Sequence, residues 1–148
     1  MDRKEHVTLT NMCMIKDGNN VLVQNKKLDD HFTGITFPGG HVEPHEPITD
    51  SVIREVWEET GLTIEHPTLV GIKEWMEEDG DRYIVFLFTA DTFSGTLHSS
   101  VEGEVFWIPL NALADQPCIW HMDHMLKVFT QNWSELFLVT DEYIPVLK

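Results

Sequence analysis

The chain has 148 residues, 42% of them hydrophobic, and a formal net charge of −15. This length supports one compact core and is short for two, so we predict a single domain over residues 1–148. The acidic balance excludes general nucleic-acid binding, which depends on clustered Lys and Arg. A phosphate ligand would therefore need another positive partner, and a divalent cation that bridges carboxylates to phosphates can supply it.

No apolar run is long enough to cross a membrane, and the first residues do not form the apolar block of a secretory signal. The cysteines, Cys13 and Cys118, lie far apart and form no CxxC motif, which is typical of a reducing compartment. We therefore expect a cytoplasmic protein without a membrane partner. The sequence leaves the oligomeric state open.

In the first half of the chain, β-branched and apolar residues alternate between turn residues, and a helix follows with Pro near its start and Gly past its end. In chain order we predict a strand over 6–16, a turn over 17–20, a strand over 21–24, a polar loop over 26–33, a short strand over 35–37 and a helix over 47–61.

The second half is predicted to contain further strands and a closing amphipathic helix with its apolar residues at helical spacing. We predict strands over 62–75, 83–90 and 105–108, an acidic turn over 77–81, and a helix over 119–133. Strands interrupted by one helix and closed by another indicate a layered α/β domain.

The segment from Gly40 to Leu62, GHVEPHEPITDSVIREVWEETGL, carries Glu55, Glu58 and Glu59 at i, i+3 and i+4, on one side of the predicted helix. Like charges so spaced repel and raise each other's pKa, so a bound cation would explain them. Oxygen ligands of this kind favour Mg²⁺ or Mn²⁺. A solvated acidic helix end is the other interpretation, but an apolar stripe beside the glutamates docks this helix on the core.

The same segment, residues 40–62, resembles the Nudix box, GX5EX7REUXEEXGU, in which U is aliphatic. Every fixed position is met, by Gly40, Glu46, Arg54, Glu55, Val56, Glu58, Glu59, Gly61 and Leu62. The preceding FPGG at 37–40 and the later strand at 104–107 extend the resemblance over most of the domain. It implies an α/β/α sandwich with a central mixed sheet, in which a loop-helix-loop motif presents metal ligands to a diphosphate.

By this resemblance, the metal ligands are the carbonyl oxygen of Gly39 and the carboxylates of Glu55, Glu58 and Glu59. Glu55 is also a candidate for the group that deprotonates or orients the attacking water, although which glutamate does so stays open. Arg54 completes the set of expected catalytic residues. It is expected to lie off the carboxylate side of the helix and, by the resemblance, to orient a glutamate through an ion pair. Glu46 would be structural or electrostatic.

A further carboxylate is expected from a loop beyond the box, where Glu104 is the preferred metal ligand and Glu102 the alternative. His121, Asp123 and His124 could be a second metal site, but we interpret them as the polar edge of the last helix.

Two further groups of side chains lie outside the fixed pattern. His41 follows the glycine pair and His45 lies in the box loop, and either could touch phosphate. Several aromatic residues could stack on a base, although core packing is their more usual role: Phe32, Trp75, Trp107, Trp120 and Phe129.

The substrate is less well defined than the reaction. Members that hydrolyse ADP-ribose carry a proline past the box and dinucleoside polyphosphate hydrolases a tyrosine, but Pro67 is too close, Pro109 too distant and Tyr83 beyond that place. The chain resembles MutT-type enzymes, which hydrolyse nucleoside triphosphates such as 8-oxo-dGTP to a monophosphate and pyrophosphate.

Other readings within the family are less favoured. Removal of diphosphate from RNA 5′ ends is disfavoured by the few Lys and Arg residues. A non-catalytic nucleotide sensor is disfavoured because all box glutamates are present. The expected partner is a small nucleotide, and the expected cofactor is Mg²⁺, with Mn²⁺ as an alternative.

Overall fold

The computed structural model describes residues 1–26 and 33–148. Phe32 and most of the predicted polar loop at 26–33 lie outside the described residues. No helix in the described ranges is long and apolar enough to span a membrane.

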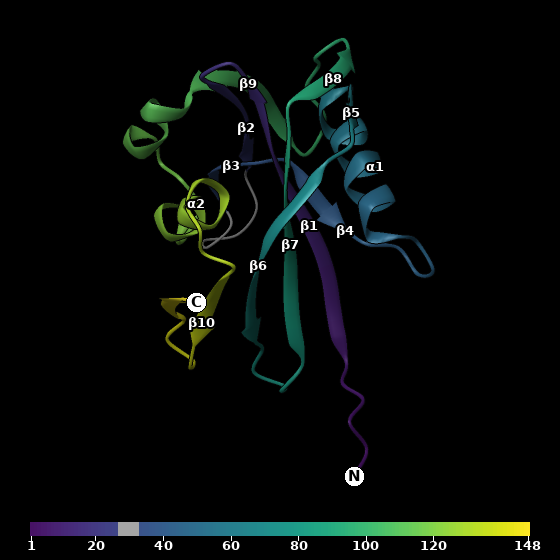
Figure 1. Cartoon of the computed structure of the whole chain (residues 1–148), viewed down its shortest axis with the longest axis vertical. Helices are drawn as coiled ribbons and strands as arrows, with labels where there is room; N and C mark the ends of the chain where they lie inside the picture. Colours follow the sequence, from purple (N-terminus) through teal and green to yellow (C-terminus); the bar gives the residue numbers. More distant parts are fainter. Residues whose placement is uncertain (27–32) are drawn as a thin grey trace.

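The described elements are short strands, two α-helices and one 3-10 helix (Figure 1). In chain order they are β1 (Val7–Asp17), β2 (Asn20–Lys26), β3 (Gly34–Thr36), β4 (Gly39–His41), α1 (Ile48–Thr60), β5 (Leu62–Glu65), β6 (Thr68–Met76), β7 (Arg82–Ala90), β8 (Thr92–Gly95), β9 (Gly103–Pro109), η1 (Leu110–Asp115), α2 (Met122–Thr130), β10 (Glu135–Val139) and β11 (Ile144–Leu147).

The main sheet is mixed and curled. Its strand order is β11-β10-β6-β7-β1-β2-β3, with β4 also paired to β1 and β9 to β2. The pairs β1/β7 and β6/β10 are parallel, and the other described pairs of this sheet are antiparallel. A small separate sheet of β5 and β8 lies next to the end of α1.

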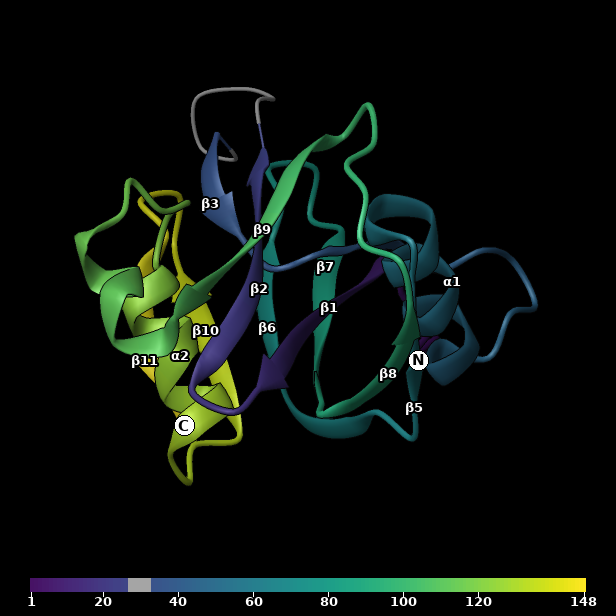
Figure 2. The same cartoon turned by 90° about the horizontal axis from the view of Figure 1, so that it is seen from above.

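The two helices cover opposite faces of the main sheet (Figure 2). Successive side chains of a strand point to opposite faces, so β1 supplies both cores. Cys13 and Ile15 pack with Val52 and Val56 of α1, whereas Met14 belongs to the core that contains the buried face of α2. The predicted α/β/α sandwich is therefore confirmed.

The predicted central helix and first hairpin agree with the structure, but the strand over 62–75 and the closing helix differ. The strand predicted over 62–75 is two strands, because His66 takes a positive φ of 50° between them and Pro67 has no N–H for a ladder. The last helix is only Met122–Thr130. It does not close the domain, because the half-buried segments β10 and β11 follow it as an antiparallel hairpin.

Gly61 ends α1 in the left-handed conformation, with φ at 80°, and its N–H donates to the carbonyl oxygen of Trp57 at 2.9 Å. A Cβ there would collide with the carbonyl oxygen of Thr96 and the ring of His98. Gly80, in the turn between β6 and β7, also has a positive φ, of 90°, but a Cβ there would meet nothing within 4 Å. Both glycines thus have a positive φ, but only Gly61 is closely packed against other residues.

We expect Gly61→Ala to lower the free energy of unfolding by about 2–4 kcal/mol, from backbone strain plus the collision. Gly80→Ala should cost only the backbone strain, about 1 kcal/mol. Urea unfolding of both variants measures the difference. Equal losses would contradict the close packing of the helix end against the segment after β8.

Candidate active site

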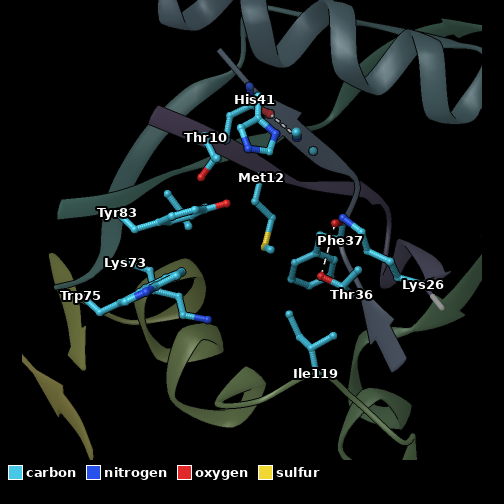
Figure 3. A pocket seen from close by; sticks show the side chains of 14 residues that line it. Thr10, Met12, Lys26, Thr36, Phe37, His41, Lys73, Trp75, Tyr83 and Ile119 are labelled. Atoms are coloured by element: carbon cyan, nitrogen blue, oxygen red, sulfur yellow. Dashed lines mark hydrogen bonds between the residues drawn. The ribbon is translucent and has the colours of Figure 1, made fainter. Parts of the chain in front are cut away.

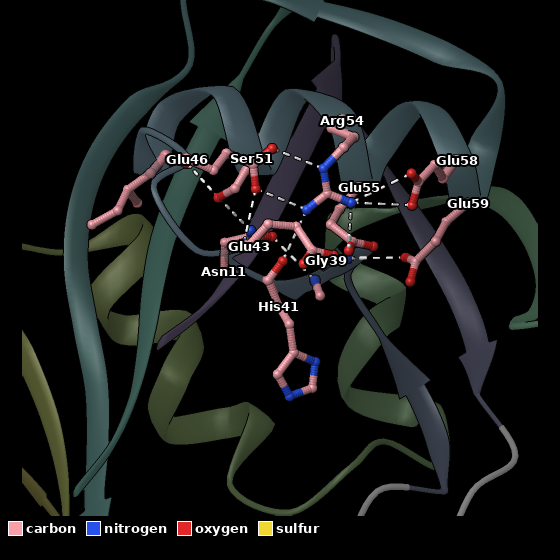
Figure 4. Close-up of polar contacts among 12 residues, drawn as sticks. Asn11, Gly39, His41, Glu43, Glu46, Ser51, Arg54, Glu55, Glu58 and Glu59 are labelled. Atoms are coloured by element: carbon pink, nitrogen blue, oxygen red, sulfur yellow. Dashed lines mark hydrogen bonds and ion pairs between the residues drawn. The ribbon is translucent and has the colours of Figure 1, made fainter. Parts of the chain in front are cut away.

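The loop before α1 is fixed to the helix by a two-point ion pair (Figure 4). Arg54 donates from Nε to Oε2 of Glu46 at 2.8 Å and from Nη2 to Oε1 at 2.9 Å. Oε1 of Glu46 also accepts the backbone N–H of Glu43 at 3.0 Å. The guanidinium hydrogen bonds hold the pKa of Glu46 down at about 2. Glu46 therefore has the structural role predicted for it.

Arg54 also reaches the glutamates on the acidic side of the helix. Its Nη1 donates to Oε1 of Glu55 at 3.0 Å and lies 3.3 Å from Oε2 of Glu58, and its Nη2 donates to the carbonyl oxygen of His41 at 3.0 Å. The predicted ion pair to a glutamate is confirmed. The prediction that Arg54 lies off the carboxylate side is wrong, because its long side chain folds across that side between Glu46 and Glu58.

Glu59, near the end of α1, is buried against the glycine pair that follows β3. Only 4% of it is exposed, and its Oε2 accepts the N–H of Gly39 at 3.0 Å. Burial raises the pKa of Glu59 to about 7; the Gly39 hydrogen bond and the charge of Lys26 oppose this rise, and the charges of Glu55 and Glu102 add to it. A cation beside this carboxylate would favour its charged form.

Glu55 lies against Gly40. A Cβ at Gly40 would collide with the carboxylate of Glu55, so a glycine is required for this close approach. Burial raises the pKa of Glu55, and the Arg54 hydrogen bond opposes that rise. Glu55 and Glu59 thus flank the glycine pair from the same helix.

Asn11 of β1 joins the three elements of the site, and sequence reasoning did not find it. Its Oδ1 accepts the N–H of Gly40 at 3.1 Å, and its Nδ2 donates to Oγ of Ser51 in α1 at 2.9 Å. It is 3% exposed. The available signal was an amide in the middle of an apolar strand, since a buried amide needs specific partners.

The remaining predicted acids are less enclosed. Glu58 is exposed, and in the described residues its printed contacts are to Arg54. Glu104 is an exposed residue of β9 opposite Asn25. Glu102, which is also exposed, lies in the turn before β9, and its charge adds to the raised pKa of Glu59. The choice between these two loop acids stays a prediction.

A cavity of about 120 Å³ begins at the glycine pair and runs along the sheet face away from α1 (Figure 3). His41 and Lys26 line it near the glycines. A second cavity, of about 220 Å³, shares part of this lining and extends to Trp120 and His121. The residues common to both cavities are Lys73, Trp75, Tyr83 and Ile119.

The predicted stacking candidates have different surroundings. Trp75 lies in the shared lining and is stacked on Tyr83, with ring centroids 4.4 Å apart and planes at 14°. Phe129 packs edge-on against Phe37 in the core, and Trp107 packs against Phe93 beside the α1 core. Of the four candidates that the structure describes, Trp75 and Trp120 therefore reach a cavity.

The histidines divide in a similar way. Asp123 and His124 form an exposed pair at the start of α2, 3.0 Å apart, as the predicted polar edge requires. His121 differs, because it precedes the helix with a φ of 60° and lines the second cavity. His45 is exposed in the loop before α1 and also has a positive φ, of 65°.

The sequence profile of the NUDIX domain matches residues 6–129. The chain belongs to the Nudix family. The Nudix hydrolase YvcI of Bacillus subtilis is 33% identical over 138 residues, covering 90% of this chain and 85% of YvcI. The phosphatase NudJ of Escherichia coli is 27% identical over 88 residues, covering 60% of this chain and 56% of NudJ. A crystal structure of MutT from Bacillus halodurans superposes with a TM-score of 0.76 at 24% identity, covering 94% of both chains.

As a Nudix hydrolase, the chain acts on nucleoside diphosphate derivatives, and enzymes of this family use divalent metal ions. Across the described ranges, no three His, Cys, Asp or Glu side chains converge closely enough to hold a metal by themselves. The oxygen donors of Glu55 and Glu59 beside the glycine pair suit a hard ion that keeps several waters and takes further ligands from substrate phosphates. The residues present therefore fit such an ion.

Lys73 of β6 lies on the cavity face of this Nudix fold and is 5% exposed. Its contact is with the ring of Trp75, whose centroid lies 5.5 Å from Nζ. Burial lowers the pKa of Lys73 to about 8. Within residues 1–26 and 33–148 this ammonium has no ion pair with a carboxylate, and a buried charge in that state favours the unfolded chain, in which it is hydrated.

We expect the free energy of unfolding of Lys73→Met at pH 7, measured by denaturant titration, to exceed that of the parent by about 3 kcal/mol. The full cost of burying the charge applies below the folded pKa. Between pH 8 and 10.5 the folded chain loses this proton before the unfolded chain does, so the parent regains stability and the difference shrinks. Lys127→Met, at an exposed position of α2, is the control. A difference that stays constant up to pH 10.5 would contradict the burial of the charge.

Proposed function

We propose that the chain is a Mg²⁺-dependent nucleoside triphosphate pyrophosphohydrolase that releases a nucleoside monophosphate and pyrophosphate. The observation that carries the proposal is the position of Glu55 and Glu59, which border the glycine pair where the cavity begins. A diphosphate at the glycines would meet the acidic edge, and the attached nucleoside would extend into the cavity. Its expected substrates include oxidised nucleotides such as 8-oxo-dGTP, and Mn²⁺ is the alternative ion.

The bound metal would supply positive charge to the phosphates and acidify a bound water. Glu55, Glu58 and Glu59 would hold it, together with the carbonyl oxygen of Gly39. Arg54 positions two of these carboxylates through its hydrogen bond to Glu55 and its ion pair with Glu58.

The attacking water forms a new bond to phosphorus while the bridging P–O bond breaks. Its proton goes to a glutamate, and Glu55 is the preferred acceptor because burial raises its pKa. Lys26 and His41 line the cavity beside the glycines and can contact phosphate oxygens. Together these side chains orient the reacting groups for in-line displacement.

We expect the parent with Mg²⁺ to convert a nucleoside triphosphate to its monophosphate and pyrophosphate in a panel of normal and oxidised nucleotides, ADP-ribose, dinucleoside polyphosphates and 5′-triphosphate RNA. Glu59→Gln and Glu58→Gln should each lower kcat on the order of a hundredfold while the chain stays folded. Glu78→Gln, in the exposed β6–β7 turn, removes the same charge and should keep full activity. Preferential turnover of ADP-ribose, or no turnover of any nucleotide, would overturn the proposal.

We further propose that the loop carboxylate of the metal site is Glu102, in place of the Glu104 preferred from the sequence. The support is electrostatic, because the charge of Glu102 adds to the raised pKa of Glu59, whereas Glu104 lies in β9 opposite Asn25; both acids are exposed. Glu102→Gln should weaken Mg²⁺ activation by about ten- to a hundredfold, and Glu104→Gln should weaken it less. Activity titrated against Mg²⁺ distinguishes them, and a larger effect at Glu104 would restore the original assignment.

A further inference from the structure

One wall of the first cavity is formed by side chains of three neighbouring strands. Lys73 and Trp75 of β6 lie beside Val85 and Tyr83 of β7, to which they are paired, and Thr10 of β1, paired with Val85, continues the row. Figure 3 shows the amino nitrogen of Lys73 pointing into the cavity. The row therefore leads from the glycine pair to a single buried cationic group.

Lys73 has no hydrogen bond or ion pair to any other described residue, and its neighbour across β10 is the apolar Leu136. A second polar atom in the same place is also unsatisfied, since Nε2 of His121 is buried without a hydrogen-bond partner in the described part of the chain. Lys73 and His121 both line the second cavity, and burial, together with the charge of Lys73, lowers the pKa of His121. Buried polar groups are almost always satisfied, so two unsatisfied ones facing a cavity indicate a ligand.

The other walls describe the shape and polarity of that ligand. Trp75 and Tyr83 are stacked on each other, Ile119 and Leu138 are apolar, and Glu77 is an acidic residue of the second cavity's lining. The aromatic and apolar walls suit the flat body of a heterocyclic base. The cavity begins at the glycine pair, so a ligand held there by its phosphates would place its base toward Lys73. The base is therefore the part of the ligand that meets the two polar nitrogens.

We propose that Lys73 makes the enzyme selective for nucleotides whose base carries a keto oxygen, and disfavours bases with an amino group in that place. This inference rests on the proposed function and adds the class of base. An ammonium can only donate hydrogen bonds, so a carbonyl oxygen satisfies it. An exocyclic amino group also donates, and would leave both groups unpaired in a buried site. Rejection of a ligand that leaves buried polar groups unpaired is a strong source of specificity.

Inosine and adenosine nucleotides are the appropriate probes, because hypoxanthine replaces the 6-amino group of adenine with a keto oxygen. We expect kcat/KM of the parent to favour ITP over ATP by about ten- to a hundredfold, the usual effect of a charged hydrogen bond. Lys73→Met should bring this ratio close to one, mainly through a loss with ITP. Lys127→Met removes an exposed lysine and should keep the parent ratio.

Equilibrium binding separates this inference from the proposed reaction. Calorimetric titration with IMP and AMP in EDTA should show tighter binding of IMP to the parent and to Lys127→Met, and a reduced preference in Lys73→Met. If no nucleotide is hydrolysed but this preference and its loss are observed, the reaction fails and base selection stands. If the ITP:ATP and IMP:AMP ratios are the same in the parent and in a folded Lys73→Met, or if neither monophosphate binds the parent, the role of Lys73 is overturned.

Discussion

The backbone of the glycine pair lies directly against the acidic edge of α1, and the geometry of the site depends on this approach. Glu59 accepts the N–H of Gly39, while Asn11 accepts the N–H of Gly40 and donates to Ser51. Strand β1, strand β4 and the helix are thereby linked through buried hydrogen bonds. Gly39 does not tolerate a Cβ, which would meet the backbone of Asn11, and a Cβ at Gly40 would displace the carboxylate of Glu55.

This arrangement is electrostatically costly in the protein alone. Glu55 and Glu59 are brought out of water beside each other, and the pKa of each is raised by burial. Arg54 compensates part of the charge, but its strongest contact is to Glu46 in the preceding loop. Lys73 on the other face of the sheet is costly in the same way. Such destabilised polar groups are typical of places where a ligand supplies the missing partner.

The helical part of the site could be predicted from the sequence because it is local. Residues three and four apart on a helix share one side whatever surrounds them, so the positions of Glu55, Glu58 and Glu59 follow from spacing. The start and end of α1 follow equally from Pro47 and Gly61. The alternation of β1 and β2 indicated the first hairpin for the same reason.

The rest of the site depends on contacts between segments far apart in the chain. The positions of Asn11 and Lys73 relative to the site depend on the order of β1, β4, β6 and β7. A single sequence does not give strand order or register. The preference for Glu104 over Glu102 depended on the path of a loop. The final hairpin was missed because β10 and β11 are short, and β10 is held by parallel pairing with β6, which is distant in sequence.

The parallel pairing of β10 with β6 also has a consequence for how the protein is made. The helix and glycine pair are synthesised early, but Leu138 of β10 and Tyr143, which follows it, line the second cavity. In a nascent chain that still lacks these residues, the helix glutamates would be present while the second cavity, which Lys73 lines, would be incomplete. The helix glutamates and the complete lining of the second cavity therefore come together only after β10 has been synthesised and has paired with β6.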